Sequence, residues 1–257
     1  MSFEKEKIER IASYENNKIL RDAAAQFTYQ SAKENYVYNF SWLGRPIIQY
    51  PQDIVIIQEL IHEVKPDLIV ETGIAHGGSL MLSASMLALN EIMGGPKNPL
   101  VVGVDIDIRA HNREAIEKHP LYKYIVMIGG SSTDEKVIAE ITKLASKKET
   151  VMVFLDSNHS HEHVLQELNA YGGLVTKGSY CVVFDTFVED MPNAFVVNRP
   201  WDKGNNPKTA IQEYLSFLKK ESEKFDNDEE SVNFNIDYEI DNKLLISCNA
   251  GGFLKRV

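Results

Sequence analysis

The sequence LIVETGIAHGGSL, residues 68–80, predicts a strand, a turn and the start of a helix, and is the most informative stretch for the fold. Residues 68–72 have the length and apolar character of a buried strand, and the long apolar run LMLSASMLALNEIM, residues 80–93, is typical of a buried helix. The glycines between them indicate a tight strand-to-helix turn. Because the turn has neither the GxGxxG nor the GxxxxGK[ST] spacing, the sequence predicts neither a dinucleotide fingerprint nor a triphosphate loop.

The same strand-then-helix pattern continues along the chain. Further strands are predicted at 100–106, 124–132, 151–156 and 179–186, with helices between them. Two strand-like runs, 232–240 and 243–257, flank Asp241-Asn242 and indicate a terminal antiparallel pair. The chain is therefore predicted to be an α/β protein with a doubly wound, mainly parallel, Rossmann-like sheet of seven strands and helices on both faces.

Residues 1–52 are predicted to form N-terminal helices and an aromatic loop packed on the core, and residues 53–257 the main domain, as one structural unit. The loop from Phe40 to Tyr50 contains Trp42 and Arg45, and the prolines at 46 and 51 forbid a long helix in this segment. Two interpretations of this loop stay open. It covers a substrate, or it clamps the N-terminal helices to the sheet.

Composition excludes several classes of function. The net charge of −10 argues against a nucleic-acid partner, which needs clustered Lys and Arg. No apolar run approaches the roughly 18 residues of a membrane span, and the charged N-terminus does not resemble a signal peptide. Cys181 and Cys248 lie in strand-like runs and are predicted to be buried thiols, so a cytoplasmic protein is expected.

Polar residues follow each predicted strand, where ligands lie in an open parallel sheet. The turn from Glu71 to Ser79 suits a ligand with a carboxylate and an ammonium, such as the methionine end of S-adenosylmethionine (SAM), although any tight turn needs glycine. Asp105 is placed to accept the ribose hydroxyls; alternatively, Asp105 and Asp107 are helix caps. The candidate SAM-binding residues are Glu71, Gly73, His76, Gly77, Ser79, Asp105, Ser131 and Asp156.

The run LDSNHSHEHV, residues 155–164, contains three histidines. The apolar pattern after it predicts a helix starting near Ser160, so the histidines do not share one face. HExxH and cysteine partners at zinc-site spacing are absent, which argues against zinc. Asp156 and His159 are the candidate catalytic residues, with His159 as general base. His161 and His163 are expected to be solvated or capping.

Asp185 follows the fifth predicted strand, so its carboxylate and that of Asp156 stand at neighbouring strand ends. Two carboxylates, completed by water and substrate oxygens, are enough to begin a Mg²⁺ site. The alternative is that Asp185 caps a loop. Phe184 cannot ligate a metal and is expected to pack against the sheet or the acceptor pocket.

The motifs WLGRPIIQYPQD, LIVETGIAHGGSL, GVDIDIRAHNR and LDSNHSHEHVLQELNAYGGLV closely resemble the cephalosporin hydroxylase family, which includes rhamnosyl O-methyltransferases. The resemblance runs from about Phe40 to the C-terminus. It implies a SAM-dependent O-methyltransferase acting on a hydroxyl of a sugar or another small metabolite, with a small-molecule acceptor. The sequence leaves assembly into a homo-oligomer open. It also implies SAM contacts at Glu71, Gly73, Ser79 and Asp105, metal at Asp156 and Asp185, and His159 as the base.

The chain departs from this family at two positions. Phe184 stands where the family often has a glutamate that ligates the metal, and Asn158 where an aspartate is common. Mg²⁺ is therefore expected to bind weakly or not at all. Two other functions stay open: a catalytically silent SAM-binding partner subunit, and a nucleotide-sugar enzyme of another reaction type.

Overall fold

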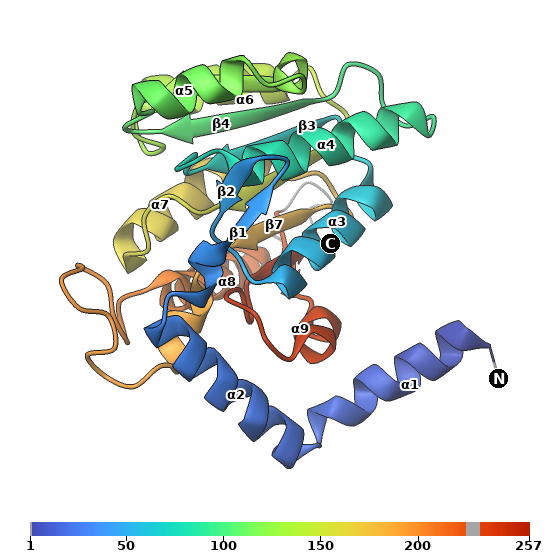
Figure 1. Cartoon of the computed structure of the whole chain (residues 1–257), viewed down its shortest axis with the longest axis vertical. Coiled ribbons are helices and arrows are strands. Elements are labelled where there is room, and N and C mark those ends of the chain that lie inside the picture. The colour runs from blue at the N-terminus through green and yellow to red at the C-terminus, as the bar shows by residue number, and fades with distance from the viewer. Residues whose placement is uncertain (1, 225–231) are drawn as a thin grey trace.

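The computed structural model describes residues 2–224 and 232–257. Its main sheet has seven strands in the order β5-β4-β3-β6-β7-β9-β8 (Figure 1). The first five strands run parallel to one another, and β9 runs antiparallel to both β7 and β8. The strands are β3 (Leu68–Thr72), β4 (Leu100–Asp105), β5 (Ile125–Gly129), β6 (Val151–Leu155), β7 (Tyr180–Val183), β8 (Phe234–Ile236) and β9 (Phe253–Arg256). The predicted fold class is confirmed.

Two helical layers cover the sheet because its central strands are apolar on both faces. Every residue of β3 is buried, and its side chains alternate between the two hydrophobic cores. One layer contains α3 (Pro51–Val64), α4 (Gly78–Ile92), α5 (Ala110–Glu117) and α9 (Tyr238–Leu244). The other contains α6 (Glu135–Ala145), α7 (His161–Tyr171) and α8 (Pro207–Lys224). Short 3₁₀ turns are η1 (Tyr36–Asn39), η2 (Tyr122–Tyr124), η3 (Gly172–Leu174) and η4 (Thr186–Asp190).

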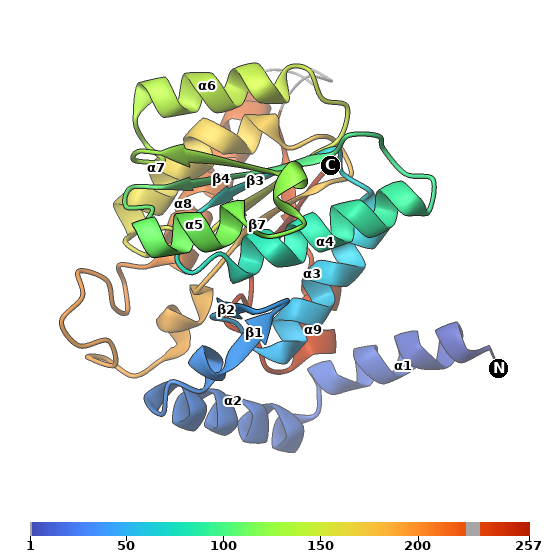
Figure 2. The same ribbon diagram turned by 45° about the horizontal axis from the view of Figure 1, so that its top comes forward.

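The two N-terminal helices, α1 (Phe3–Glu15) and α2 (Lys18–Lys33), lie at one end of the molecule, away from the sheet (Figures 1 and 2). No residue of α1 is buried, and α2 buries only Ala24 and Thr28. These helices are the ones that the sequence predicted. The division of the chain after residue 52 stays a prediction. It would fall inside α3, which begins at Pro51.

A small hairpin, β1 (Phe40–Trp42) paired with β2 (Arg45–Ile47), occupies the aromatic loop. Its turn has positive φ at Leu43 and Gly44, and the leucine gives no sequence signal for such a turn. The hairpin packs directly on α4. A Cβ at Gly78 would lie 2.2 Å from the Pro46 carbonyl oxygen, and the Trp42 indole donates to Ser85 Oγ at 3.0 Å. These contacts fix the hairpin on α4, and both interpretations of the loop stay predictions.

The C-terminal pair differs from its prediction. β8 and β9 are antiparallel as expected, but Asp241-Asn242 lies inside helix α9 instead of a turn. The Asp237 side chain caps this helix by accepting from Ile240 N, and Ile240 is buried against the sheet. Cys248 therefore lies outside any strand, whereas Cys181 lies in β7. Both thiols are free and buried, as predicted.

No helix among residues 2–224 and 232–257 combines the length and apolar character needed to cross a bilayer.

The buried Asp53 carboxyl, at the start of α3, joins that helix to the loop before β9. It accepts Ser247 Oγ at 2.6 Å and Cys248 N at 2.9 Å. Burial raises its pKa from 3.8 to about 7, against these two hydrogen bonds, which lower it. At neutral pH the folded state therefore holds this group close to its titration point.

We expect the free energy of unfolding to rise as pH falls from 8 to 5.5, because the folded state then binds a proton on Asp53 that the unfolded state does not. Asp53→Asn should reduce this dependence. Urea unfolding of both proteins at the two pH values measures the change in the free energy of unfolding. An equal change in the two proteins would assign the titration to a group other than Asp53.

Candidate functional site

The carboxyl ends of β3, β4, β6 and β7 meet at one edge of the sheet. The chain order reverses between β3 and β6, since β4 and β5 continue to one side and β7 to the other. Ligands in open α/β sheets bind at this switch point. The predicted residues Glu71, Asp105, Asp156 and Asp185 end or follow these four strands, so the fold brings them to the same edge.

The glycine-rich turn after β3 lies directly against the loop after β6. Gly73 has φ +89°, and a Cβ there would lie 2.1 Å from the Asp156 carbonyl oxygen. Asp156 N in turn donates to Thr72 O at 3.0 Å. Gly77, with φ +84°, is the residue before α4, whose free N–H groups face this edge. Glycine is therefore required at position 73 on two grounds, conformation and space.

Asp105 fastens the same turn. Its Oδ2 accepts Ile74 N at 2.9 Å and Ala75 N at 3.1 Å, and its Oδ1 accepts Asp107 N at 2.9 Å. The alternative that Asp105 and Asp107 cap the next helix does not hold, since Arg109 is the N-cap of α5 and no side chain caps it. A carboxylate has about four acceptor positions. One is left on Oδ1 for a ligand.

A second set of hydrogen bonds holds the turn from the hairpin side. Arg45 Nε donates to the His76 carbonyl at 2.8 Å, and its Nη2 donates to Asn112 Oδ1 at 2.7 Å. Asn112, which is buried, also donates to Ala75 O at 2.9 Å. The sequence pattern points to Arg45 without this role and gives no signal for Asn112. These bonds fix the backbone at His76, whose imidazole stays a candidate SAM contact only by prediction.

The Glu71 carboxyl is buried beneath the turn. Ser83 Oγ donates to its Oε1, and Ser79 also hydrogen-bonds to it. Burial raises the pKa of Glu71 to about 7, although both serines act to lower it. Ser79 therefore contacts Glu71, and both are among the predicted SAM-binding residues.

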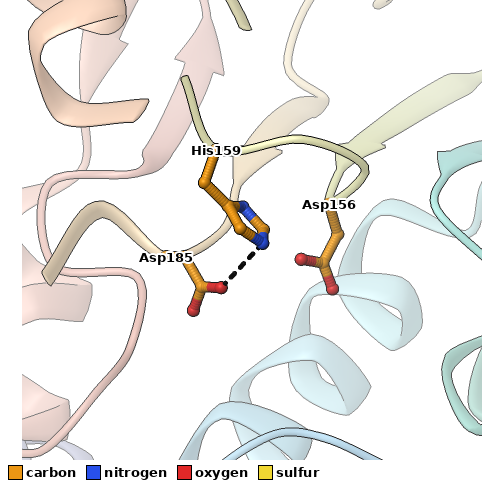
Figure 3. Close-up of side chains that lie close together, drawn as sticks. All are labelled: Asp156, His159 and Asp185. Atoms are coloured by element: carbon orange, nitrogen blue, oxygen red, sulfur yellow. Dashed lines mark ion pairs between the residues drawn. The ribbon is translucent and has the colours of Figure 1, made fainter. Parts of the chain in front are cut away.

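Asp156, His159 and Asp185 point into one small space (Figure 3). His159 Nε2 lies 3.2 Å from Asp185 Oδ2, and one ligand atom from each of the three side chains falls within 4.8 Å of the others. Asp185 has φ +54°, which turns the chain out of β7 towards His159. Trp201, from the loop before α8, meets the His159 ring edge-on with centroids 4.9 Å apart. We call Asp156, His159 and Asp185 the Asp-His-Asp cluster.

The electrostatics of the cluster are dominated by negative charge. Burial raises the pKa of Asp156 well above its ordinary value, and the charges of Asp185, Glu71 and Glu167 add to this effect. A cation in this space, whether a sulfonium or a metal ion, would be stabilised by the same charges.

The other two histidines of the run lie elsewhere, and the expectation that they are solvated or capping is wrong. His161 hydrogen-bonds to Thr209 and Glu213 of α8, at 2.8 and 3.0 Å. His163 Nε2 lies 3.0 Å from Ser132 Oγ and 3.1 Å from Ser157 Oγ, which donates to the buried Glu167. They link α7 to its neighbours, so His159 is the histidine that reaches the cluster.

Phe184 and Ser131 are two further positions that the sequence singled out. Phe184 is buried and its ring meets Phe154 with centroids 6.0 Å apart, so it packs against the sheet as expected. Ser131, after β5, shares a hydrogen bond with Thr133 Oγ1 at 2.9 Å. It remains a candidate for the adenine pocket. Trp201 was missed, because a tryptophan in a loop rich in Pro, Asn and Gly carries no signal of what it covers.

Comparison with known proteins gives one family and several relatives. The family model "Rhamnosyl O-methyltransferase/CmcI" matches residues 34–257. The rhamnosyl O-methyltransferase of Mycobacterium leprae is 28% identical over 195 residues, which cover 75% of this chain and 78% of the relative. The enzyme of that name from Mycobacterium tuberculosis is 27% identical over 239 residues, with coverage of 91% and 86%.

A solved structure of CmcI with Mg and SAM superposes with a TM-score of 0.54 at 20% identity, over 86% of this chain and 77% of that one. A CmcI structure without ligand gives a TM-score of 0.53 with the same identity and coverage. At this identity the likeness supports the fold alone.

Proposed function

This chain belongs to the Rhamnosyl O-methyltransferase/CmcI family, the cephalosporin hydroxylase family of the sequence resemblance, and we propose that it transfers a methyl group from SAM to a hydroxyl of a sugar. The observation that supports the chemistry most directly is the contact between His159 Nε2 and Asp185 Oδ2, beside the glycine turn where SAM would bind. The relatives' names point to a rhamnosyl group as the acceptor class.

The residues around the turn suit SAM by their chemistry. When bound, SAM supplies an electrophilic methyl group on its sulfonium. In our proposal the turn and Glu71 bind the methionine end, Asp105 accepts a ribose hydroxyl at its remaining Oδ1 position, and Ser131 lines the adenine pocket. Burial raises the pKa of Asp156, next to Gly73, and a positively charged donor beside this carboxyl would favour its ionised form.

The Asp-His-Asp cluster receives the acceptor hydroxyl in this proposal. His159 takes the proton of the acceptor hydroxyl, and its Nε2 contact with Asp185 Oδ2 at 3.2 Å stabilises the imidazolium that forms. Trp201 holds the ring by an edge contact and limits the access of water to it. Methyl transfer otherwise depends on alignment of the acceptor oxygen with the methyl group, which the rigid strand ends provide.

Mg²⁺ fits the cluster only in part. The carboxylates of Asp156 and Asp185 would hold it, and when bound it would polarise the acceptor hydroxyl. The third donor of the cluster is an imidazole nitrogen, and Mg²⁺ prefers oxygen. We therefore propose that Mg²⁺ binds weakly.

Direct turnover tests the function. The protein is incubated with SAM and either a simple rhamnoside or a nucleotide-activated rhamnose, and products are analysed by mass spectrometry for the gain of one methyl group. Transfer to either acceptor supports the proposal. SAM binding in calorimetry without transfer to any hydroxylated acceptor would favour a silent SAM-binding subunit, and no SAM binding would overturn the methyltransferase assignment.

Asp105→Ala should weaken SAM binding by roughly 1–3 kcal/mol, because it removes a ribose acceptor and frees two backbone N–H groups of the turn. Asp107→Ala is the matched control, since the Asp107 side chain is 76% exposed. Calorimetry with SAM compares the two variants. Equal affinities in both would move the ribose contact away from Asp105.

We also propose a cytoplasmic location, a small-molecule acceptor and assembly into a homo-oligomer. The free, buried thiols of Cys181 and Cys248 suit a reducing compartment. Apolar side chains on the N-terminal helices that are largely exposed support assembly: Phe3, Ile8 and Ile19. Size-exclusion chromatography with light scattering tests the last point.

A further inference from the structure

We propose that the Asp-His-Asp cluster is a divalent-cation site in which His159 Nε2 replaces a third carboxylate, and that it therefore selects Co²⁺- and Zn²⁺-like cations over Mg²⁺. The inference rests on the proposed function in one respect, because the cation would bind the imidazole that otherwise accepts the proton. It concerns the ligand set of this chain, where Phe184 removes a carboxylate that the sequence resemblance leads one to expect.

The distances fit a bound cation. In an octahedral site with bonds of about 2.1 Å, adjacent ligands lie about 3.0 Å apart and opposite ones about 4.2 Å apart. The Nε2–Oδ2 separation between His159 and Asp185 is 3.2 Å, close to an adjacent pair. Ligand atoms of all three side chains lie within 4.8 Å of one another, close to the separation of opposite ligands. Figure 3 shows the two carboxyl groups on either side of the imidazole nitrogen.

The charges at this place also favour a dication. Asp156 is surrounded by the charges of Asp185, Glu71 and Glu167, and all three oppose its ionisation. A dication between Asp156 and Asp185 would reverse that effect. Phe184 cannot contribute, because its ring lies in the core against Phe154. Among the residues that the structure describes, His159 is the remaining member of the group that could hold a metal.

An imidazole ligand changes which cation is preferred. Carboxylate and water oxygens suit Mg²⁺, whereas imidazole suits zinc and its neighbours, and divalent affinity rises from Mn²⁺ through Co²⁺ along the first row. A cation bound at Nε2 disfavours protonation of the same imidazole ring. Co²⁺ or Zn²⁺ should therefore inhibit methyl transfer, and Mg²⁺ at the same free concentration should not.

The test uses the full chain without SAM. Co²⁺ binding is followed by visible absorption and calorimetry, and Mg²⁺ binding by calorimetry. We expect Co²⁺ to bind about 100-fold more tightly than Mg²⁺. His159→Ala should lower Co²⁺ affinity about 10–100-fold and Mg²⁺ affinity less than about threefold, so that the preference collapses. His161→Ala, which removes a nearby histidine bound to α8, should keep the preference.

A second variant keeps the test decisive if His159→Ala folds poorly. His159→Gln offers an amide oxygen in place of nitrogen, so it should shift the preference towards Mg²⁺. Equal affinities for Co²⁺ and Mg²⁺ in the unaltered protein, or an unchanged preference in His159→Gln, would overturn the proposal. SAM binding is measured separately. Co²⁺ binding as described, without SAM binding or methyl transfer, would overturn the proposed function and leave the metal site standing.

Discussion

The His159→Ala variant should lose about 10²–10⁴-fold in kcat while its affinity for SAM stays nearly unchanged. His159 is the imidazole that faces Asp156 and Asp185, and its Nε2 contact with Asp185 would stabilise the charge formed when it accepts a proton. The residues proposed to bind SAM are backbone and side-chain groups of the β3 and β4 ends, which this substitution does not touch. Single-turnover kinetics with calorimetry separates the two quantities.

The neighbouring histidines provide controls within the same ten residues. His161→Ala should keep kcat, because that side chain contacts Thr209 and Glu213 of α8 instead of the cluster. All assays should contain a chelator, since a Co²⁺-like contaminant would block the unaltered protein. An equal loss of kcat in His161→Ala and His159→Ala would show that the base lies elsewhere or that the whole loop had moved.

The residues at the carboxyl edge of the sheet could be predicted from sequence, because the pattern that places each of them is local. Each strand is an apolar run of about five residues, and the residue after it must leave the sheet. Parallel strands end at the same edge, so Asp105, Asp156 and Asp185 had to come close once the alternation of strands and helices was recognised. The proximity of His159 followed from its position one turn after Asp156.

The remaining contacts depend on residues far apart in the chain. Trp201 meets His159, and Asn112 binds both Arg45 and the turn, but nothing around these residues indicates their partners. The same limit explains the error at the C-terminus. The run from 243 to 248 is apolar enough for a strand, whereas the burial of Ile240 against the sheet and the Asp237 cap favour helix α9.

Gly73→Ala should lower the free energy of unfolding by roughly 2–5 kcal/mol and displace the loop that carries Asp156. Two effects add. A side chain at φ +89° costs about 1–2 kcal/mol, and a Cβ placed 2.1 Å from the Asp156 carbonyl oxygen forces the two strand ends apart, at about 1–3 kcal/mol. SAM affinity should fall as well, because the proposed binding turn moves with the backbone. Urea unfolding and SAM calorimetry measure the two effects.

Gly94→Ala separates conformation from collision. Gly94 has φ +87°, almost the value at Gly73, but a Cβ there would meet nothing within 4 Å. The control should therefore lose only the conformational part, about 1–2 kcal/mol, and keep its SAM affinity. The difference between the two variants then measures how closely the turn after β3 is pressed against the loop after β6. Similar losses in both variants would mean that Asp156 can yield without cost, and the rigid alignment on which the proposed methyl transfer depends would have to come from other contacts.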